Sequence, residues 1–311
     1  MKIVRTFATS ANVGPGFDTL GICFDLYNEY EYSICDKYII EEFKEKYKDP
    51  KRNLIIKSYE EVFKRLNKKL IYIKLKQIKQ DIPTSRGLGS SASCIVTGIL
   101  IANDILNNPL SKDEIFQIAS SIEGHPDNVA PLIYGGFTCS FKEEEYKKIA
   151  LDINPKLKFM VCIPPFELST AKAREVLPKT VSMKEAVFNV SHSIAMIKAL
   201  ETGDMELLKL GKKDMLHEPY RYPLIEGSQK MIEYASNNDA VCLISGAGST
   251  LLLISDKKLE DLPKFNDWIF KEVNISKIGA YIYEEWWIFY CSQIYFTWLF
   301  WSSNWGSWND K

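Results

Sequence analysis

The segment with the clearest chemical potential is a loop rich in glycine and serine that leads into a predicted helix. It comprises Pro83, Thr84, Ser85, Arg86, Gly87, Leu88, Gly89, Ser90, Ser91, Ala92 and Ser93. Glycine lets the backbone approach a ligand, and the free N–H groups and positive dipole end of a helix start attract phosphate. The loop therefore predicts a phosphate site, although it lacks the lysine of a GxxxxGK[ST] loop. A tight turn capped by a serine is the structural alternative.

Three further segments carry polar residues between glycines. Residues 10–21 read SANVGPGFDTLG, residues 123–131 read EGHPDNVAP, and residues 244–250 read ISGAGST. The glycines of residues 12–16 mark a turn that is either functional or merely tight.

Composition and charge exclude several classes of function. The 311 residues include 39 Lys and Arg against 40 Asp and Glu, so the net charge is −1 and no overall basic field predicts binding to nucleic acid or to an anionic membrane. The seven cysteines are scattered without a CxxC pair, which indicates reduced thiols and a cytoplasmic protein. The three histidines lie away from any cysteine pair, so we expect no zinc site. The first ten residues lack the apolar core of a secretion signal.

The first half of the chain alternates strand and helix patterns around these motifs. Residues 3–7 predict a strand, 53–66 a helix, 72–75 a strand, and 92–106 a helix that is apolar on nearly every side and therefore buried. A second helix over residues 112–123 ends at Gly124, which suits a carboxyl-terminal cap. A strand follows Gly136.

The pattern changes after about residue 150, where we place a domain boundary between residues 1–150 and 151–285. Residues 159–163 predict a strand, and residues 204–216 and 224–237 predict helices. Strands are expected at 241–244 and 251–254. One face of a long helix is formed by Met183, Val187, Val190, Ile194 and Ile197. The alternation favours a two-domain α/β or α+β protein.

The last 26 residues, 286–311, have a composition unlike the rest. Six of the seven tryptophans lie there, and no charge occurs from Trp286 to Asn309. One interpretation is a non-native end, translated past the natural stop or in a shifted frame. The other is a tail that binds a membrane interface or a partner, although interspersed serines and asparagines argue against a spanning helix.

The ordered motifs resemble those of the GHMP kinases, a superfamily named for galactokinase, homoserine kinase, mevalonate kinase and phosphomevalonate kinase. The loop over 83–92 is similar to the phosphate loop of these enzymes, residues 10–21 to their amino-terminal signature, and residues 244–250 to their carboxyl-terminal glycine loop. Residues 123–131, followed by Gly135-Gly136-Phe137, resemble the homoserine kinases specifically. The resemblance runs from residue 3 to about 284. An aliphatic residue commonly follows the proline of the loop, where this chain has Thr84.

The resemblance implies an α+β fold with an amino-terminal ATP-binding α/β domain and a carboxyl-terminal ferredoxin-like α/β plait. It also implies ATP-dependent phosphorylation of the side-chain hydroxyl of L-homoserine to O-phospho-L-homoserine, a step of threonine biosynthesis. Two alternatives stay open. The chain could be a GHMP kinase for another small alcohol, or a binding protein that kept the fold and lost catalysis. The oligomeric state is not fixed, and a homodimer is one option.

The resemblance also implies roles for single residues. The loop over 83–93 would bind ATP, with Ser91 and Glu123 on Mg²⁺ and Asn53 near the nucleoside, although a helix cap is the plainer role for Asn53. The expected substrate-binding residues are Asn12, Asp18, His125, Asp127, Arg174 and Arg221. The two arginines would bind the carboxylate, because a guanidinium pairs with it in two places, although a solvated surface role is the common alternative for a single arginine. Asn128 would bind the hydroxyl that is phosphorylated, and Asp18 could accept its proton. His125 is not expected to act as a general base, because a loose phosphoryl-transfer transition state needs little base catalysis.

Overall fold

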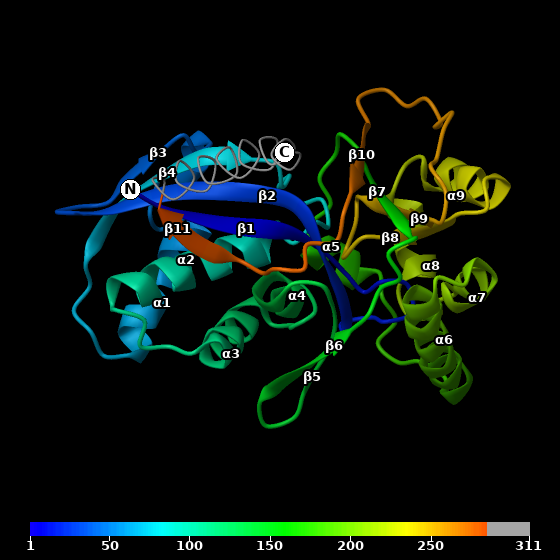
Figure 1. Ribbon diagram of the computed structural model, residues 1–311, viewed down its shortest axis with the longest axis horizontal. Helices are drawn as coiled ribbons and strands as arrows, with labels where there is room; N and C mark the ends of the chain where they lie inside the picture. Colours follow the sequence, from blue (N-terminus) through cyan, green and yellow to red (C-terminus); the bar gives the residue numbers. More distant parts are fainter. Residues whose placement is uncertain (285–311) are drawn as a thin grey trace, which may run out of the picture.

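The computed structural model describes residues 1–284. The two interpretations of the aromatic tail, residues 286–311, therefore concern a segment outside the described residues. Figure 1 shows the described chain as two lobes that lie side by side, each built of a β-sheet and helices.

The amino-terminal half is built on a seven-stranded sheet. Its strands follow the order β11-β1-β2-β4-β3, and β5 pairs with β2 and β6. The strands are β1 (Lys2–Ala11), β2 (Leu20–Cys35), β3 (Ile39–Glu41), β4 (Tyr72–Gln80), β5 (Phe137–Lys142), β6 (Tyr146–Leu151) and β11 (Tyr281–Glu284). β11 runs antiparallel to β1, so the last described strand joins the sheet of the first half.

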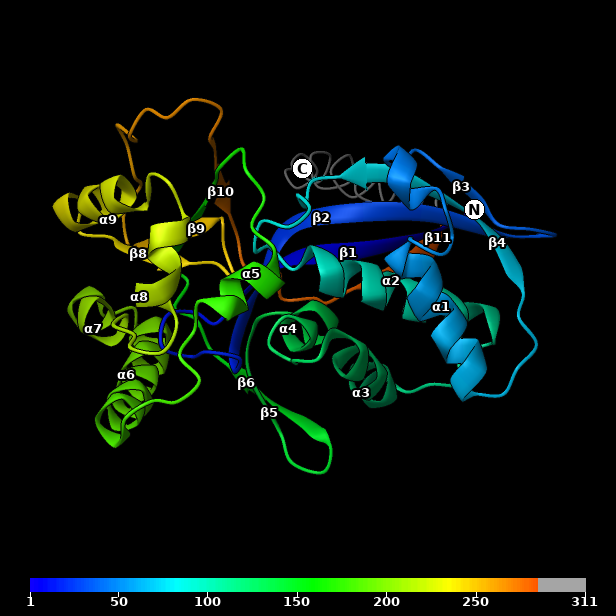
Figure 2. The same ribbon diagram turned by 180° about the vertical axis from the view of Figure 1, so that it is seen from behind.

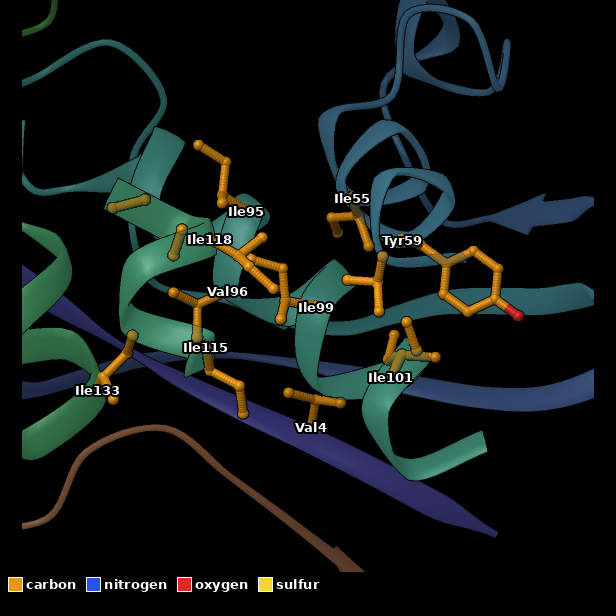
Figure 3. Close-up of a cluster of buried hydrophobic side chains, with 14 of the residues drawn as sticks. Val4, Ile55, Tyr59, Ile95, Val96, Ile99, Ile101, Ile115, Ile118 and Ile133 are labelled. Carbon is orange, nitrogen blue, oxygen red and sulfur yellow. The ribbon is translucent and has the colours of Figure 1, made fainter. Parts of the chain in front are cut away.

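Four helices cover one face of this sheet (Figure 1). They are α1 (Leu54–Arg65), α2 (Ser90–Ile105), α3 (Lys112–Glu123) and α4 (Val129–Tyr134). α2 lies at the centre, and the close-up in Figure 3 shows Val96 and Ile99 among side chains of the neighbouring helices and of β1. The prediction that this helix is buried is confirmed, since ten of its 16 residues are buried. The central position fixes the amino end of α2, where the glycine loop arrives.

The carboxyl-terminal half contains a four-stranded antiparallel sheet (Figure 2). Its strands are β7 (Lys158–Ile163), β8 (Val241–Ile244), β9 (Leu251–Ser255) and β10 (Ile269–Val273), in the order β10-β7-β9-β8. Fourth, first, third, second is the strand order of a ferredoxin-like plait. Residues 256–268 contain no helix, so the second helix of that motif is replaced by a loop.

Helices α5 (Thr170–Glu175), α6 (Met183–Thr202), α7 (Met205–Gly211), α8 (Glu218–Arg221) and α9 (Ser228–Asn237) all lie between β7 and β8. Two predicted helices were too long. The helix predicted over 204–216 ends at Gly211, because Asp214 instead caps the next helix by accepting hydrogen bonds from the backbone N–H groups of His217 and Glu218. The helix predicted over 224–237 begins only at Ser228, because Gly227 adopts a left-handed conformation with φ of 86°.

Helix α6 forms as predicted, but most of its apolar face points to solvent. Met183, Val187, Val190 and Ile194 are 79%, 60%, 63% and 65% exposed. The opposite side packs inward, where Asn189 donates hydrogen bonds to Pro15 O and to Asp214, and Met196, Ala199 and Leu200 are fully buried in an apolar cluster. These contacts, rather than the exposed apolar stripe, therefore orient this helix.

A further apolar cluster, separate from the one around α2, lies between the two halves. It joins Ala8 and Phe24 of the first sheet to Phe159 and Leu200 of the second half. The rings of Phe24 and Phe159 lie 5.8 Å apart. This contact holds the loops of the two halves against each other. Within residues 1–284, no helix combines the length and apolar character needed to cross a membrane.

Candidate functional site

A cavity of about 320 Å³ lies where the two halves meet. It brings together sixteen of the predicted site residues: Asn12, Asp18, Asn53, Thr84, Ser85, Arg86, Gly87, Gly89, Ser90, Ser91, Glu123, His125, Asp127, Asn128, Arg174 and Arg221. Four residues of the predicted ATP loop do not line the cavity: Pro83, Leu88, Ala92 and Ser93. Leu88, Ala92 and Ser93 are fully buried. The sequence motifs thus converge on one site.

The glycine loop is held by its carbonyl groups. Backbone N–H groups of Thr9, Leu168 and Thr250 donate to the carbonyls of Leu88, Ser85 and Arg86, respectively. The hydroxyl of Ser245 donates to Gly87 O at 2.7 Å. The N–H groups of residues 87–92, in contrast, have no acceptor within residues 1–284. Helix α2 begins at Ser90, and Gly89 before it provides no side-chain cap, so the alternative of a turn capped by a serine is wrong. Uncapped N–H groups at a helix start form an anion site.

Two glycines of this loop have no room for a side chain. A Cβ on Gly87, at φ of 73°, would lie 2.1 Å from Ser245 O, and one on Gly89, at φ of 68°, would lie 2.0 Å from the hydroxyl of Thr9. Gly87 is therefore required by the close approach of residues 244–250, and Gly89 by the close approach of Thr9 on β1.

A hydroxyl and a carboxylate meet beside the loop. Ser91 Oγ donates to Glu123 Oε2 at 2.7 Å. Burial raises the pKa of Glu123, and the hydrogen bond from Ser91 opposes that shift. Residues 1–284 contain no cluster of three or more His, Cys, Asp or Glu side chains that could hold a metal alone. A cation here would therefore need oxygen ligands from a bound phosphate or water in addition to this pair.

His125, Asp127 and Asn128 form a connected group at the start of α4. His125 Nδ1 lies 2.8 Å from Asp127 Oδ1, which also accepts from the Asn128 N–H. Burial alone would lower the pKa of His125, but the hydrogen bond and charge of Asp127 outweigh it and raise this pKa. Asn128 Oδ1 accepts from the hydroxyl of Thr9 at 2.8 Å. The Nδ2 group of Asn128 makes only a 3.5 Å contact with Asp127 within the described chain, so it remains free to donate.

Opposite charges face each other at the other end of the cavity. Both terminal nitrogens of Arg174 donate to the carboxylate of Asp18, at 2.7 and 3.0 Å. The hydrogen bonds to Asp18 raise the pKa of Arg174. Asn12 fixes this carboxylate group by accepting from the Asp18 N–H and donating to Gly246 O. The polar atoms of the Asn12 side chain thus join residues 10–21 to the glycine loop of residues 244–250.

Arg221 lies deeper and is only 1% exposed. Its Nε donates to Ala173 O at 3.1 Å, and Nη1 donates to Gly246 O and to His217 Nδ1. Burial and the nearby charge of Arg174 lower the pKa of Arg221 to about 10. The structure therefore places two cationic groups at one end of the cavity, with Asp18 beside them.

Asn53 and Arg86 line the cavity but have structural partners. The side chain of Asn53 caps α1 by accepting from the N–H groups of Ile55 and Ile56, and donates to Tyr47 O. Arg86 donates to the carbonyls of Thr84, Pro164 and Pro165. The predicted role of Asn53 near a nucleoside stays a prediction.

An aromatic and amide-rich part of the cavity was missed from the sequence. Tyr30 and Phe43 stack with ring centres 5.9 Å apart, and Tyr47, Gln77 and Cys94 also line this part. No short motif marks these residues. The sheet register that pairs Tyr30 with Gln77 brings two of them together, and only the folded sheet shows it.

Comparisons with known proteins find similar sequences over most of this chain. The family model for the GHMP kinases N terminal domain matches residues 53–136, and the family model for the GHMP kinases C terminal matches residues 196–262. A homoserine kinase of Clostridium beijerinckii is 40% identical over 298 residues, which cover 91% of this chain and 99% of that protein. A homoserine kinase of Clostridium botulinum is 39% identical over 296 residues, which cover 91% and 98%.

The fold also matches a solved structure. The crystal structure of homoserine kinase from Cytophaga hutchinsonii superimposes with a TM-score of 0.78 at 24% identity, covering 91% of this chain and 97% of that chain. At this identity the likeness supports the architecture alone. The predicted two-domain α+β fold is confirmed.

Proposed function

The chain belongs to the GHMP kinases and, within them, to the homoserine kinases, and on this premise we propose that it transfers the γ-phosphoryl group of ATP to the hydroxyl of L-homoserine in one in-line step. The product would be O-phospho-L-homoserine, a precursor in threonine biosynthesis. One observation carries the proposal: a single cavity joins uncapped backbone N–H groups at one end to paired opposite charges at the other. These two ends suit a triphosphate and an amino acid.

The nucleotide would lie along the glycine loop. The N–H groups of residues 87–92 would donate to its phosphate oxygens. The part of the cavity lined by Tyr30 and Phe43 has the apolar faces that a planar base needs. Asn53 is proposed to lie at its nucleoside edge.

Ser91 and Glu123 fit a Mg²⁺ ion, because this ion is usually held by one or two protein oxygens together with substrate phosphates and water. Their side chains meet within hydrogen-bond distance beside the loop. When bound, the ion would neutralise charge on the phosphates. For the protein itself, Glu123 contributes a carboxylate whose partial burial strengthens its attraction for a cation.

L-Homoserine would replace the internal ion pair. Its ammonium group is expected to bind Asp18, and its carboxylate to bind Arg174 and Arg221. A zwitterion can satisfy both members of the Asp18–Arg174 pair, whereas a ligand with one charge leaves the other member unpaired. This exchange supports selection of an amino acid over a neutral alcohol.

The reacting hydroxyl would be oriented by Asn128, whose Nδ2 group can donate to it. His125 is a poor base because its raised pKa keeps the imidazole protonated to higher pH. Positioning and charge stabilisation supply most of the rate in such transfers. Asp18 is the proposed proton acceptor, and no phosphorylated enzyme is formed.

The test is ADP release from ATP and magnesium with a panel of homoserine, serine, threonine, mevalonate and galactose. Homoserine should raise the rate well above every other acceptor. A preference for mevalonate or galactose would favour a different GHMP kinase, and no response to any acceptor would favour a binding protein. Mixing the enzyme with labelled ATP alone should leave the protein unlabelled, and a trapped phosphoenzyme would reject direct transfer.

We also propose a cytoplasmic location and a homodimer. The six described cysteines are all free thiols, which suits a reducing compartment. The exposed stripe of Met183, Val187, Val190 and Ile194 has the alternating spacing of four and three residues with which two copies of a helix pack together. Sedimentation of the full chain should show a dimer that Val190→Lys weakens. A monomer at all concentrations would contradict the dimer.

A further inference from the structure

A fully buried histidine, His217, contacts Arg221. His217 is 0% exposed and precedes α8, the short helix that carries Arg221. Its Nε2 lies 2.8 Å from Gly14 O, in the amino-terminal signature segment. Its Nδ1 lies 3.2 Å from Nη1 of Arg221. The imidazole thus links the amino-terminal half of the protein to the carboxyl-terminal half.

The partners of the ring determine its tautomer. Gly14 O can only accept, so Nε2 must carry the proton. Arg221 can only donate, so Nδ1 must present its lone pair. Only a neutral imidazole protonated on Nε2 makes both contacts. Burial and the charge of Arg221 lower the pKa of His217, which keeps the ring neutral, while the nearby Asp214 opposes this shift.

The same contacts define which part of Arg221 is available to a ligand. Nε and Nη1 are engaged by Ala173 O, Gly246 O and the histidine. Nη2 has no acceptor within residues 1–284. The ring of Phe17 stacks on His217 at 5.2 Å and also lies 5.2 Å from the Arg221 guanidinium carbon, so the arginine has little freedom to rotate.

We propose that His217 is a positioning residue for substrate recognition, which fixes the Arg221 guanidinium so that its Nη2 faces the amino-acid end of the cavity. This inference rests on the proposed role of Arg221 in binding the homoserine carboxylate. His217 acts only through Arg221 and lies at the amino-acid end, so its loss should affect homoserine and leave ATP unaffected.

Two substitutions separate the two contacts of the ring. His217→Asn can keep an acceptor near the Nδ1 position, whereas His217→Gln can keep a donor near the Nε2 position. We expect His217→Gln to raise the KM for homoserine by about 10-fold to 100-fold, the usual effect of losing a hydrogen bond to a charged group. The KM for ATP should change less than about 2-fold, and His217→Asn should restore most of the homoserine KM. His192→Gln, on the outer helix α6, is the matched control and should leave both KM values unchanged.

A double-mutant cycle tests whether the effect passes through Arg221. In an Arg221→Lys background, His217→Gln should add less than about 2-fold to the homoserine KM. Additive effects, equal changes in both KM values, or no rescue by His217→Asn in a folded variant would overturn the inference. Thermal melting identifies variants that do not fold, and the cycle then rests on the folded ones. Failure of the wild-type enzyme to phosphorylate homoserine would instead reject the proposed function.

Discussion

The two ends of the cavity are built from different parts of the chain. At the phosphate end, recognition depends on the backbone: the carbonyls of the glycine loop are anchored to the protein, and its N–H groups are left without acceptors within residues 1–284. At the amino-acid end, recognition depends on side chains, since Asp18, Arg174 and Arg221 present their charges from three separate segments.

This difference predicts how each end responds to substitution. A backbone site tolerates changes in side-chain chemistry but not in chain conformation, because a Cβ in the wrong place moves several donors at once. A side-chain site is sensitive to single charges, because removing one partner leaves another unpaired. Four substitution experiments separate these behaviours.

The largest effect is expected at Gly87. In Gly87→Ala, the new Cβ would collide with the backbone oxygen of Ser245 at 2.1 Å and separate the two glycine loops. We expect kcat/KM for ATP to fall roughly 1000-fold, since several phosphate donors are displaced together. Gly136→Ala is the matched control, because Gly136 has a similar φ of 69° but nothing within 4 Å of the point that its Cβ would occupy. Equal losses in the two variants would show that backbone strain, rather than loop contact, is responsible.

The second experiment tests whether charge exchange controls the amino-acid end. Asp18→Asn should lower kcat/KM for homoserine about 100-fold, because the ammonium loses its partner. It should lower kcat/KM for 4-hydroxybutyrate, which lacks the ammonium, by only about 10-fold, because the proton acceptor is lost but Arg174 is released from its ion pair. Steady-state kinetics with both acceptors measure this.

The result with the deaminated acceptor is the informative outcome. If Asp18 only bound the ammonium and accepted no proton, its removal would leave 4-hydroxybutyrate turnover at or above the wild-type rate. Asp104→Asn is the control, since it removes a salt bridge to Lys2 outside the cavity lining. It should leave both acceptors unchanged.

Features encoded within short segments could be predicted from the sequence. The boundaries of α3 are as predicted, because Ser111 and Glu114 form a capping box at its start and Gly124 adopts the left-handed conformation at its end. The glycine loop and α2 were also predicted from a short segment, in which glycines and serines precede an apolar run. Most residues of the predicted motifs line the same cavity.

Features that depend on contacts across the fold could not be predicted. The buried face of α6 is determined by hydrogen bonds from Asn189 and Ser193 to Pro15 O and by the burial of Met196, Ala199 and Leu200, so the apolar periodicity predicted the helix but not its orientation. The stacked pair of Tyr30 and Phe43 depends on the strand register and on the loop after β3. The position of His217 could not be predicted because its contact with Gly14 joins two segments that lie far apart in the chain.

The third experiment separates a side-chain contribution at the phosphate end from the backbone. Glu123→Gln removes the charge beside Ser91, so we expect the Mg²⁺ concentration for half-maximal activity to rise roughly 10-fold while the activity at saturating Mg²⁺ is largely kept. Titration of activity with Mg²⁺ at fixed ATP measures it. Glu114→Gln, at the other end of the same helix, should leave the titration unchanged. An unchanged titration in Glu123→Gln would remove this residue from the proposed ion site.

The smallest effect on catalysis is expected at Glu218, a buried carboxyl on α8, the helix that also carries Arg221. It is 5% exposed and accepts a hydrogen bond from the Ile244 N–H, and burial raises its pKa from 4.5 to about 8. The folded protein therefore retains a proton that the unfolded chain releases above its ordinary pKa. This contribution to the free energy of unfolding is fully present below about pH 4.5 and is lost as the pH rises towards 8.

Glu218→Gln mimics the protonated carboxyl at every pH. Its free energy of unfolding should equal that of the wild type near pH 4 and exceed it by roughly 5 kcal/mol near pH 9, the amount that corresponds to a rise in pKa from 4.5 to about 8. Urea unfolding at a series of pH values measures the difference. A variant whose stability follows the wild-type pH profile in parallel would show that Glu218 is ionised in the folded protein, and the amino-acid end would then contain one more buried negative charge opposite its arginines.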